Sequence, residues 1–285
     1  MREALYHDGP YKMKIRKSLS CLGVLGVLFS LSACQKKNEE VTETPVSPGK
    51  ALVMEAIEAH GGAENWYANG DLKFRWTYHM SDRGRTVDTV QVIDPVSWNA
   101  VHTVPGSDVT FGRNAGSYWL APQDGAFMMP AQFWTLTPVY FLGIPFVFND
   151  EGANFELLEE TKSFQGKDYT QVKITYGAGS GESPDDHYVL LIDPDSKQVR
   201  GTYYTVTSPF VYKGGEVIVK FLSLDGLKDY NGVLLSTSHK TYTMTDGVIG
   251  EQMRYTEISE TEFLARGETD FSAPEGAKIL SNTPE

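Results

Sequence analysis

Cysteine is almost absent from this sequence. Only Cys21 and Cys34 occur among its 285 residues, and both lie near the N-terminus. A disulfide framework is therefore excluded for the roughly 250 residues that follow. That length suits one large β domain or two small domains, and it is sufficient to bury a hydrophobic core. We expect this core, rather than covalent cross-links, to stabilise the protein.

Positive charge is also scarce. The chain has 25 Lys and Arg residues against 37 Asp and Glu residues, which gives a formal net charge of −12 at pH 7. A surface this acidic argues against nucleic acid as a partner, and against binding to anionic membranes by charge alone.

The sequence lacks a recognisable arrangement of catalytic or metal-binding residues. The histidines that follow Cys34 include no pair with metal-ligand spacing and no HExxH motif. The glycine-rich segment GAGSGES, residues 177–183, fits neither a nucleophile elbow nor a phosphate loop and is typical of a hairpin loop. We therefore expect no metal, no cofactor and no enzymatic activity. These histidines are His60, His79, His102, His187 and His239.

The N-terminus has the pattern of an export signal. A basic segment, residues 14–17, follows Met13 and precedes the apolar run Leu19–Leu31. That run is too short to span a bilayer in the mature protein but has the length of a signal peptide. The sequence Leu-Ser-Ala-Cys ending at Cys34 resembles a bacterial lipobox. An ordinary signal peptide followed by a coincidental cysteine is the alternative.

We predict that residues 1–33 are a signal peptide, with residues 1–12 upstream of the true start, and that Cys34 is the lipid attachment site, for example for palmitate. Residues 34–48 are polar and contain two prolines, which is typical of a flexible tether. Gln35, in place of the aspartate common in lipoproteins of the inner membrane, favours the outer membrane. The expected location is the cell envelope, anchored by lipid at the outer membrane and facing the periplasm, with exposure at the cell surface as an alternative.

The folded domain, residues 49–280, is expected to open with a helix. Ser47 can cap it and Pro48 suits its first turn, while Gly61-Gly62 ends it. The segment LKFRWTYHM, residues 72–80, then alternates apolar and polar residues without a fault. This period of two predicts a strand with one buried face and one solvated face.

Further strand patterns fill most of the remaining sequence, and turns between them are marked by Gln165-Gly166, Asn231-Gly232 and Asp246-Gly247. About eleven strands in series, with short turns and few helices, predict one antiparallel meander. A sheet of that length curls, so it either closes as a barrel or covers its concave face with apolar residues.

The uncharged segment FWTLTPVYFLGIPFVF, residues 133–148, interrupts this β pattern. It is too short and too broken by proline to span a membrane, and it lacks the basic residues of an interfacial helix. We expect a short helix that starts at Pro138 and ends at Gly143. Its aromatic residues must be covered, either as a core plug or as a lid over a cavity, against the face that bears Phe74, Trp76 and Tyr78.

Three segments resemble the LolA/LolB-like superfamily of lipoprotein carriers and related lipoproteins. They are AHGGAENW at residues 59–66, DYNGVLLSTSHKTY at residues 229–242, and TDFSAPEGAKIL at residues 269–280. The resemblance spans about residues 49–280 and rests on structural motifs. It implies a mainly β (α+β) domain, in which one curved antiparallel sheet forms an incomplete β-barrel with helices over an apolar concavity.

The resemblance also implies a ligand and a site, because this concavity holds acyl chains in the carriers. The residues expected to line it are Phe74, Trp76, Tyr78, Met80, Phe133, Trp134, Tyr140, Phe141, Leu142 and Phe146. Arg75 is expected to point outward and away from the ligand. A lipid anchor disfavours the role of a soluble shuttle.

Two hypotheses for function follow from the sequence. In the first, the protein is a bacterial envelope lipoprotein that binds a hydrophobic ligand, namely an acyl chain, a lipid or a lipoprotein, without catalysis. In the second, it is a structural or sensor module with a fully packed core that acts through contacts with an envelope protein. In both, the membrane is a partner through the N-terminal acyl anchor.

Overall fold

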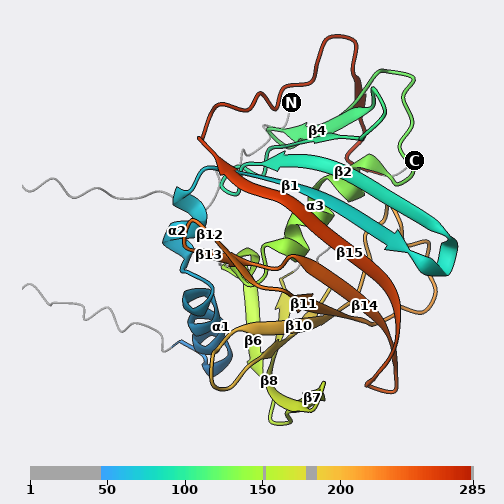
Figure 1. The fold of residues 1–285 in the computed structure, drawn as a ribbon. Helices are drawn as coiled ribbons and strands as arrows, with labels where there is room; N and C mark the ends of the chain where they lie inside the picture. Colours follow the sequence, from blue (N-terminus) through green and yellow to red (C-terminus); the bar gives the residue numbers. More distant parts are fainter. Residues whose placement is uncertain (1–45, 150–151, 178–184, 284–285) are drawn as a thin grey trace, which may run out of the picture. The chain divides into compact units, whose positions relative to one another are not determined.

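The computed structural model describes residues 46–149, 152–177 and 185–283. The predicted signal peptide, Cys34 and the tether up to residue 45 lie outside the described residues, as does most of the GAGSGES segment. The chain from Ser47 onward forms one compact unit, built on a single fourteen-stranded sheet (Figure 1). Within the described residues, no helix has the length and the apolar character that crossing a membrane would need.

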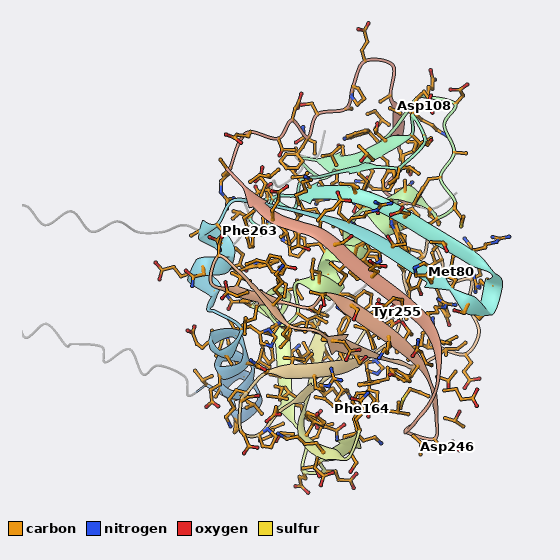
Figure 2. All side chains as sticks on the ribbon, viewed as in Figure 1. Met80, Asp108, Phe164, Asp246, Tyr255 and Phe263 are labelled. Carbon is orange, nitrogen blue, oxygen red and sulfur yellow. The ribbon has the colours of Figure 1, made fainter. Side chains whose placement is uncertain are left out.

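The sheet consists of two antiparallel meanders joined side by side. The first meander contains β1 (Asp71–Met80), β2 (Arg85–Ile93), β3 (Ala100–Thr103), β4 (Thr110–Asn114) and β5 (Ser117–Ala121). The second contains β8 (Lys167–Tyr176), β9 (Tyr188–Ile192), β10 (Val199–Tyr204), β11 (Lys220–Asp225), β14 (Ser238–Thr245) and β15 (Val248–Leu264). Pairing of β1 with β15 joins them, and this strand pair runs from Phe263 at one end to Met80 at the other (Figure 2).

Short strands complete the sheet and its surroundings. β16 (Lys278–Leu280) pairs with β5 at one edge, and β6 (Ala153–Leu157) pairs with β8 at the other. β7 (Lys162–Phe164) also pairs with β8, whereas β12 (Lys228–Tyr230) and β13 (Val233–Leu235) form a separate hairpin. In the described part of the chain the two edge strands do not pair with each other, so the curved sheet stays open and the predicted fold class is confirmed.

The sequence analysis was wrong about the number and the order of the strands. The described residues contain sixteen strands rather than about eleven, and the short strands β12 and β16 are among those that were not predicted. The sheet is not one continuous meander, because β1 pairs with β15 and β16 pairs with β5. These long-range pairings bring together segments that carry no local sequence signal for each other.

The predicted two-residue hairpin turns are confirmed. Gln165-Gly166, Asn231-Gly232 and Asp246-Gly247 have positive φ at both positions and connect β7 to β8, β12 to β13 and β14 to β15. This is the geometry whose twist matches that of paired strands.

β1 has the two faces that its sequence predicts. Leu72, Phe74, Trp76 and Met80 are each at most 3% exposed, and Tyr78 lies partly buried in the same core. On the outer face, Arg75 binds Asp88 through Nη2 and Oδ2 at 2.7 Å, and also pairs with Glu260. The expectation that Arg75 points away from the concave face is therefore confirmed.

The N-terminal helix also agrees with the sequence. α1 (Pro48–Ala59) is capped by Ser47, whose Oγ accepts a hydrogen bond from the backbone N–H of Lys50 at 3.3 Å. A second helix, α2 (Ala63–Ala68), was missed. Its six residues are too few to show a helical period, and it is held by Trp66, whose ring stacks on Phe146 at a centroid distance of 4.9 Å.

The helix α3 (Ala131–Leu142) crosses from one meander to the other. The chain leaves β5 beside one edge of the sheet and re-enters at β6, which is the opposite edge. The connection therefore has to traverse the sheet, and α3 packs into the same core as β1 (Figure 1). This topology explains why the connection is uncharged: a segment that lies across the concave face is removed from water on most sides.

The predicted start of α3 at Pro138 was wrong, although its end at Gly143 is confirmed. Pro138 lies inside the helix, where proline lacks the N–H that would bond to the carbonyl of Trp134 and typically costs about 3 kcal/mol. Burial of Trp134, Val139 and Leu142 offsets this cost, because each fully buried side chain of this kind contributes about 1.5–3 kcal/mol. Tertiary packing thus overrides the local rule that places proline in the first turn.

Candidate functional site

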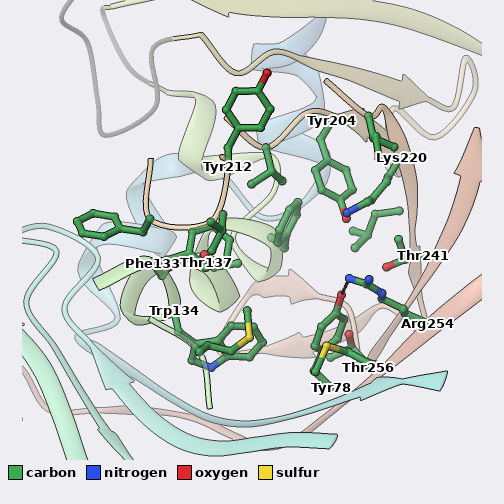
Figure 3. A pocket seen from close by; sticks show the side chains of 18 of the residues that line it. Tyr78, Phe133, Trp134, Thr137, Tyr204, Tyr212, Lys220, Thr241, Arg254 and Thr256 are labelled. Atoms are coloured by element: carbon green, nitrogen blue, oxygen red, sulfur yellow. Dashed lines mark hydrogen bonds between the residues drawn. The ribbon is translucent and has the colours of Figure 1, made fainter. Parts of the chain in front are cut away.

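A cavity of about 450 Å³ lies between α3, the inner face of the sheet and the segment 206–218 that connects β10 to β11. This volume falls within the roughly 300–1,000 Å³ that is common for ligand sites. Figure 3 shows side chains from all three parts facing one hollow. The sheet contributes Trp76, Tyr78, Met80, Tyr204, Lys220, Leu222, Thr241, Arg254 and Thr256.

α3 presents one stripe to this cavity and another to the core. Phe133, Thr137 and Phe141 recur at intervals of four residues, which places them on one side of a helix, and all three line the cavity. The core stripe consists of Ala131, Thr135, Val139 and Leu142, all of which are buried. The helix is therefore part core and part lid, which explains why it has no polar face.

Aromatic contacts connect the lid to the sheet on both sides of the cavity. The ring of Trp134 lies 5.7 Å from that of Tyr78, between centroids. The ring of Phe141 meets Tyr204 edge-on at 4.8 Å. These rings give the cavity a rigid apolar wall of the kind that buries hydrocarbon.

A cationic group from β15 closes one end of the cavity. Arg254 is largely buried and donates from Nε and Nη2 to the two carboxylate oxygens of Asp82, at 3.1 and 2.9 Å. Its Nη1 donates to the hydroxyl of Tyr78 at 2.8 Å (Figure 3). Burial opposes the charge of Arg254, but these partners together hold its pKa above the usual value, and the bond from Arg254 lowers the pKa of Asp82. The charge of Arg254 is therefore compensated within the protein.

Lys220, on β11, lies at the same end of the cavity and is half-buried (Figure 3). Its side chain forms no hydrogen bond and no ion pair with any residue that the structure describes. Burial, and next the positive charges of Arg254 and Arg83, lower the pKa of Lys220, and the smaller attraction of the Asp82 carboxylate does not cancel this effect. The cavity thus contains a cation that the described protein groups leave unpaired, opposite a wall of aromatic rings.

Six of the ten residues that the sequence analysis assigned to the site line this cavity. They are Trp76, Tyr78, Met80, Phe133, Trp134 and Phe141. Whether they contact a ligand stays a prediction.

The other four assigned residues lie elsewhere. Phe74, Leu142 and Phe146 have no exposed surface and belong to the core, while Tyr140 hydrogen-bonds through its hydroxyl to that of Tyr176. Phe74 shares a face with Trp76, but a strand advances about 3.3 Å per residue, so the row continues past the end of the cavity. None of these four residues therefore lines this cavity.

The sequence analysis missed the polar end of the cavity. Arg254 belongs to an inward row of β15 that continues with Thr256 and Ile258, which are 1% and 4% exposed. The alternation of β15 places Arg254 on the same face as these buried residues, and this pattern could have predicted that its side chain points inward. The sequence around Lys220 does not show which face of β11 points inward, because both faces of this strand carry apolar residues. The neighbouring Phe221 is also fully buried, in a second cluster on the outer face of the sheet.

The buried histidines serve as structural links. In the described residues, no group of three His, Cys, Asp or Glu side chains is placed to hold a metal ion. His60 bridges the carbonyl of Leu234 and the N–H of Val199 at 3.1 and 3.0 Å, and Nε2 of His102 lies 2.9 Å from the carbonyl of Thr135. Each joins two parts of the fold through neutral hydrogen bonds.

Comparison with known proteins identifies a similar fold. A model of DUF6503, a family of unknown function, matches residues 132–239. No curated protein matches the sequence. The LolA superfamily protein NE2245 from Nitrosomonas europaea is 10% identical with a TM-score of 0.52, covering 80% of this chain and 99% of that one. A DUF1329 family protein from Desulfovibrio piger is 10% identical with a TM-score of 0.48, covering 76% and 94%. The domain therefore has a LolA-like fold, and the resemblance seen in the sequence is confirmed at that level.

Proposed function

We propose that this protein is an envelope lipoprotein that binds a hydrophobic ligand, an acyl chain or a lipid, without catalysing a reaction. The observation that carries the proposal is the cavity of about 450 Å³ between the aromatic stripe of α3 and the concave face of the sheet. Transfer of each methylene from water into such a site is worth about 0.8 kcal/mol. The LolA-like fold supports the same conclusion, because in the carriers of that superfamily the concavity is expected to hold acyl chains.

A fully packed structural module is the competing function. For that function, the aromatic side chains of the segment 133–148 would have to fill the concave face of the sheet completely. Part of the segment does so, because Phe146 and Phe148 are at most 1% exposed. Phe133 and Phe141 instead face the cavity, and this division favours a ligand over a plain core plug.

Direct extraction tests the binding function. The protein is purified under native conditions and extracted with organic solvent, and the extract is analysed by lipid mass spectrometry. A fluorescent fatty acid is then titrated into protein from which the lipid has been removed. We expect co-purified lipid and saturable uptake of one probe per chain. Absence of both would refute the proposed function.

Anchoring through Cys34 is tested separately. Cys34→Ser is expected to move the protein from the membrane fraction to the soluble periplasmic fraction and to abolish labelling by an alkyne analogue of palmitate. Two acyl chains give stable membrane binding, whereas the acidic domain has no charge attraction to anionic lipids. Cys21→Ser is the matched control and should change neither result. Unchanged membrane retention of Cys34→Ser would exclude acylation at this residue.

A further inference from the structure

The cavity is chemically asymmetric. Phe133 and Trp134 of α3 form its apolar side, while Lys220 and Arg254 lie together at the opposite side (Figure 3). Each of the two cations extends from a different strand of the sheet, and Thr241, which pairs in register with Arg254, contributes a hydroxyl beside it. A purely apolar guest would leave this polar end without a partner.

The charges at the polar end do not balance. Asp82 accepts two hydrogen bonds from Arg254 and also lies 3.7 Å from Nε of Arg83, so its carboxylate is already shared by two cations. Lys220 is then left over, half-buried and unpaired in the described structure. An isolated charge that is partly removed from water is unfavourable, and in proteins such groups are paired with an opposite charge.

One carboxylate among the described residues lines the cavity and has to be considered. Glu216 belongs to the segment between β10 and β11, and its side chain is exposed to solvent. No ion pair joins Glu216 to Lys220 among the described residues. Glu216 therefore lies at the mouth of the cavity in water, where its charge is screened, and the inner end stays positive.

We propose that the ligand is an anionic amphiphile, whose carboxylate or phosphate head is bound by Lys220 with Arg254 beside it and whose hydrocarbon tail lies along Phe133, Trp134 and Phe141. This inference rests on the proposed function and adds the chemical class of the ligand and the orientation in which it binds. The head supplies the counter-charge that Lys220 lacks. The tail meets the aromatic stripe of α3.

Four probes with the same twelve-carbon chain test the head-group requirement. Dodecanoate, dodecyl phosphate, dodecanol and dodecylamine are titrated at pH 7 against protein that carries a displaceable fluorescent apolar probe. Dodecanoate or dodecyl phosphate should bind about ten-fold to a hundred-fold more tightly than dodecanol, the range expected for a hydrogen bond to a charged group. The ratio of the two anions identifies the head as carboxylate or phosphate.

The Lys220→Met variant tests whether Lys220 causes the preference for anionic heads. Lys220→Met keeps the length of the side chain and removes the charge, so it should reduce the preference for the anions over dodecanol by the same ten-fold to hundred-fold factor, without weakening dodecanol. Lys240→Met is the matched control, because Lys240 lies on the adjacent strand β14 and pairs in register with Ser223, on the face opposite the cavity. It should leave the preference unchanged.

A stability measurement makes the outcome decisive. Removing an unpaired, half-buried charge should raise the Tm of the unliganded Lys220→Met protein, by about 2–4 °C for a domain of this size. Equal binding of all four probes, tighter binding of dodecylamine, or an unchanged anion preference in a folded Lys220→Met protein would each overturn the inference while leaving hydrophobic binding intact. If none of the four probes binds, the proposed function fails as well.

Discussion

Phe141→Asp is expected to weaken acyl-chain uptake by about a hundred-fold while the far-UV circular dichroism of the sheet is retained. Phe141 lines the cavity and contacts Tyr204, and it is only partly buried. Its replacement removes about 2–3 kcal/mol of apolar contact with the ligand, which corresponds to a factor of about one hundred in Kd. The new carboxylate would also place a charge in the wall against which the acyl chain is expected to lie. Titration with a fluorescent fatty acid measures the effect.

Phe141→Asn and Phe146→Asp are the informative comparisons. Phe141→Asn removes the same apolar contact without adding charge, so it separates the loss of apolar contact from the effect of the added carboxylate. Phe146 has no exposed surface and stacks on Trp66, so Phe146→Asp buries a carboxylate in the core and should unfold the domain. If Phe141→Asp also unfolds the domain, then α3 acts as a core plug and the cavity is not its purpose.

Acidification from pH 7 to pH 5 is expected to lower the free energy of unfolding by several kcal/mol. Burial lowers the pKa of His60 to about 4, and that of His102 and His239 to about 3, from the ordinary value of 6.5. Between pH 6.5 and these values, the unfolded chain binds protons that the folded chain does not, so stability falls as the pH falls. Each histidine contributes about 2 kcal/mol at pH 5, since one pKa unit corresponds to about 1.4 kcal/mol.

The hydrogen bonds explain why these rings stay neutral. In His60, one ring nitrogen accepts the N–H of Val199, so protonation there would place two hydrogens against each other. In His102, Nε2 donates to the carbonyl of Thr135, while Nδ1 is buried and has no hydrogen-bond acceptor among the residues that the structure describes. Asp71 and Asp186 act in the opposite direction, because burial raises the pKa of both carboxyl groups.

Urea unfolding at pH 7, 6 and 5 measures this dependence. His102→Gln provides the internal comparison, because a glutamine amide can still donate to the carbonyl of Thr135 but does not titrate. The variant should be less stable at pH 7 and should lose about 2 kcal/mol less than the native chain between pH 7 and pH 5. An identical pH dependence in both proteins would show that His102 does not couple proton binding to folding.

Predictions from the sequence were correct where the residues of a single helix, strand or turn determine its structure. The alternation in residues 72–80 predicted both faces of β1, and Ser47 with Gly61-Gly62 predicted the limits of α1. The hairpin turns at Gln165-Gly166 and Asn231-Gly232 were also correct, because their backbone requires positive φ and the residue types reveal it.

Predictions from the sequence were wrong where contacts between distant segments determine the structure. α3 continues through Pro138 because packing on both sides outweighs the local cost of proline. Phe74 and Trp76 are equivalent by period, yet only Trp76 lies beneath the cavity. The number of strands was underestimated because β12 and β16 have only three residues each, too short for a period to be visible.

The sequence by itself determined that this is a mainly β domain with one apolar concave face and an apolar helical segment to cover it. Alternation, turn chemistry and hydrophobicity are local properties, so they can be read along the chain. Only the tertiary structure decided that α3 crosses the sheet between its two edges, that part of it leaves a cavity, and that Lys220 and Arg254 meet at one end of that cavity. Those facts depend on the pairing of β1 with β15 and of β11 with β14, which brings together residues that are far apart in sequence.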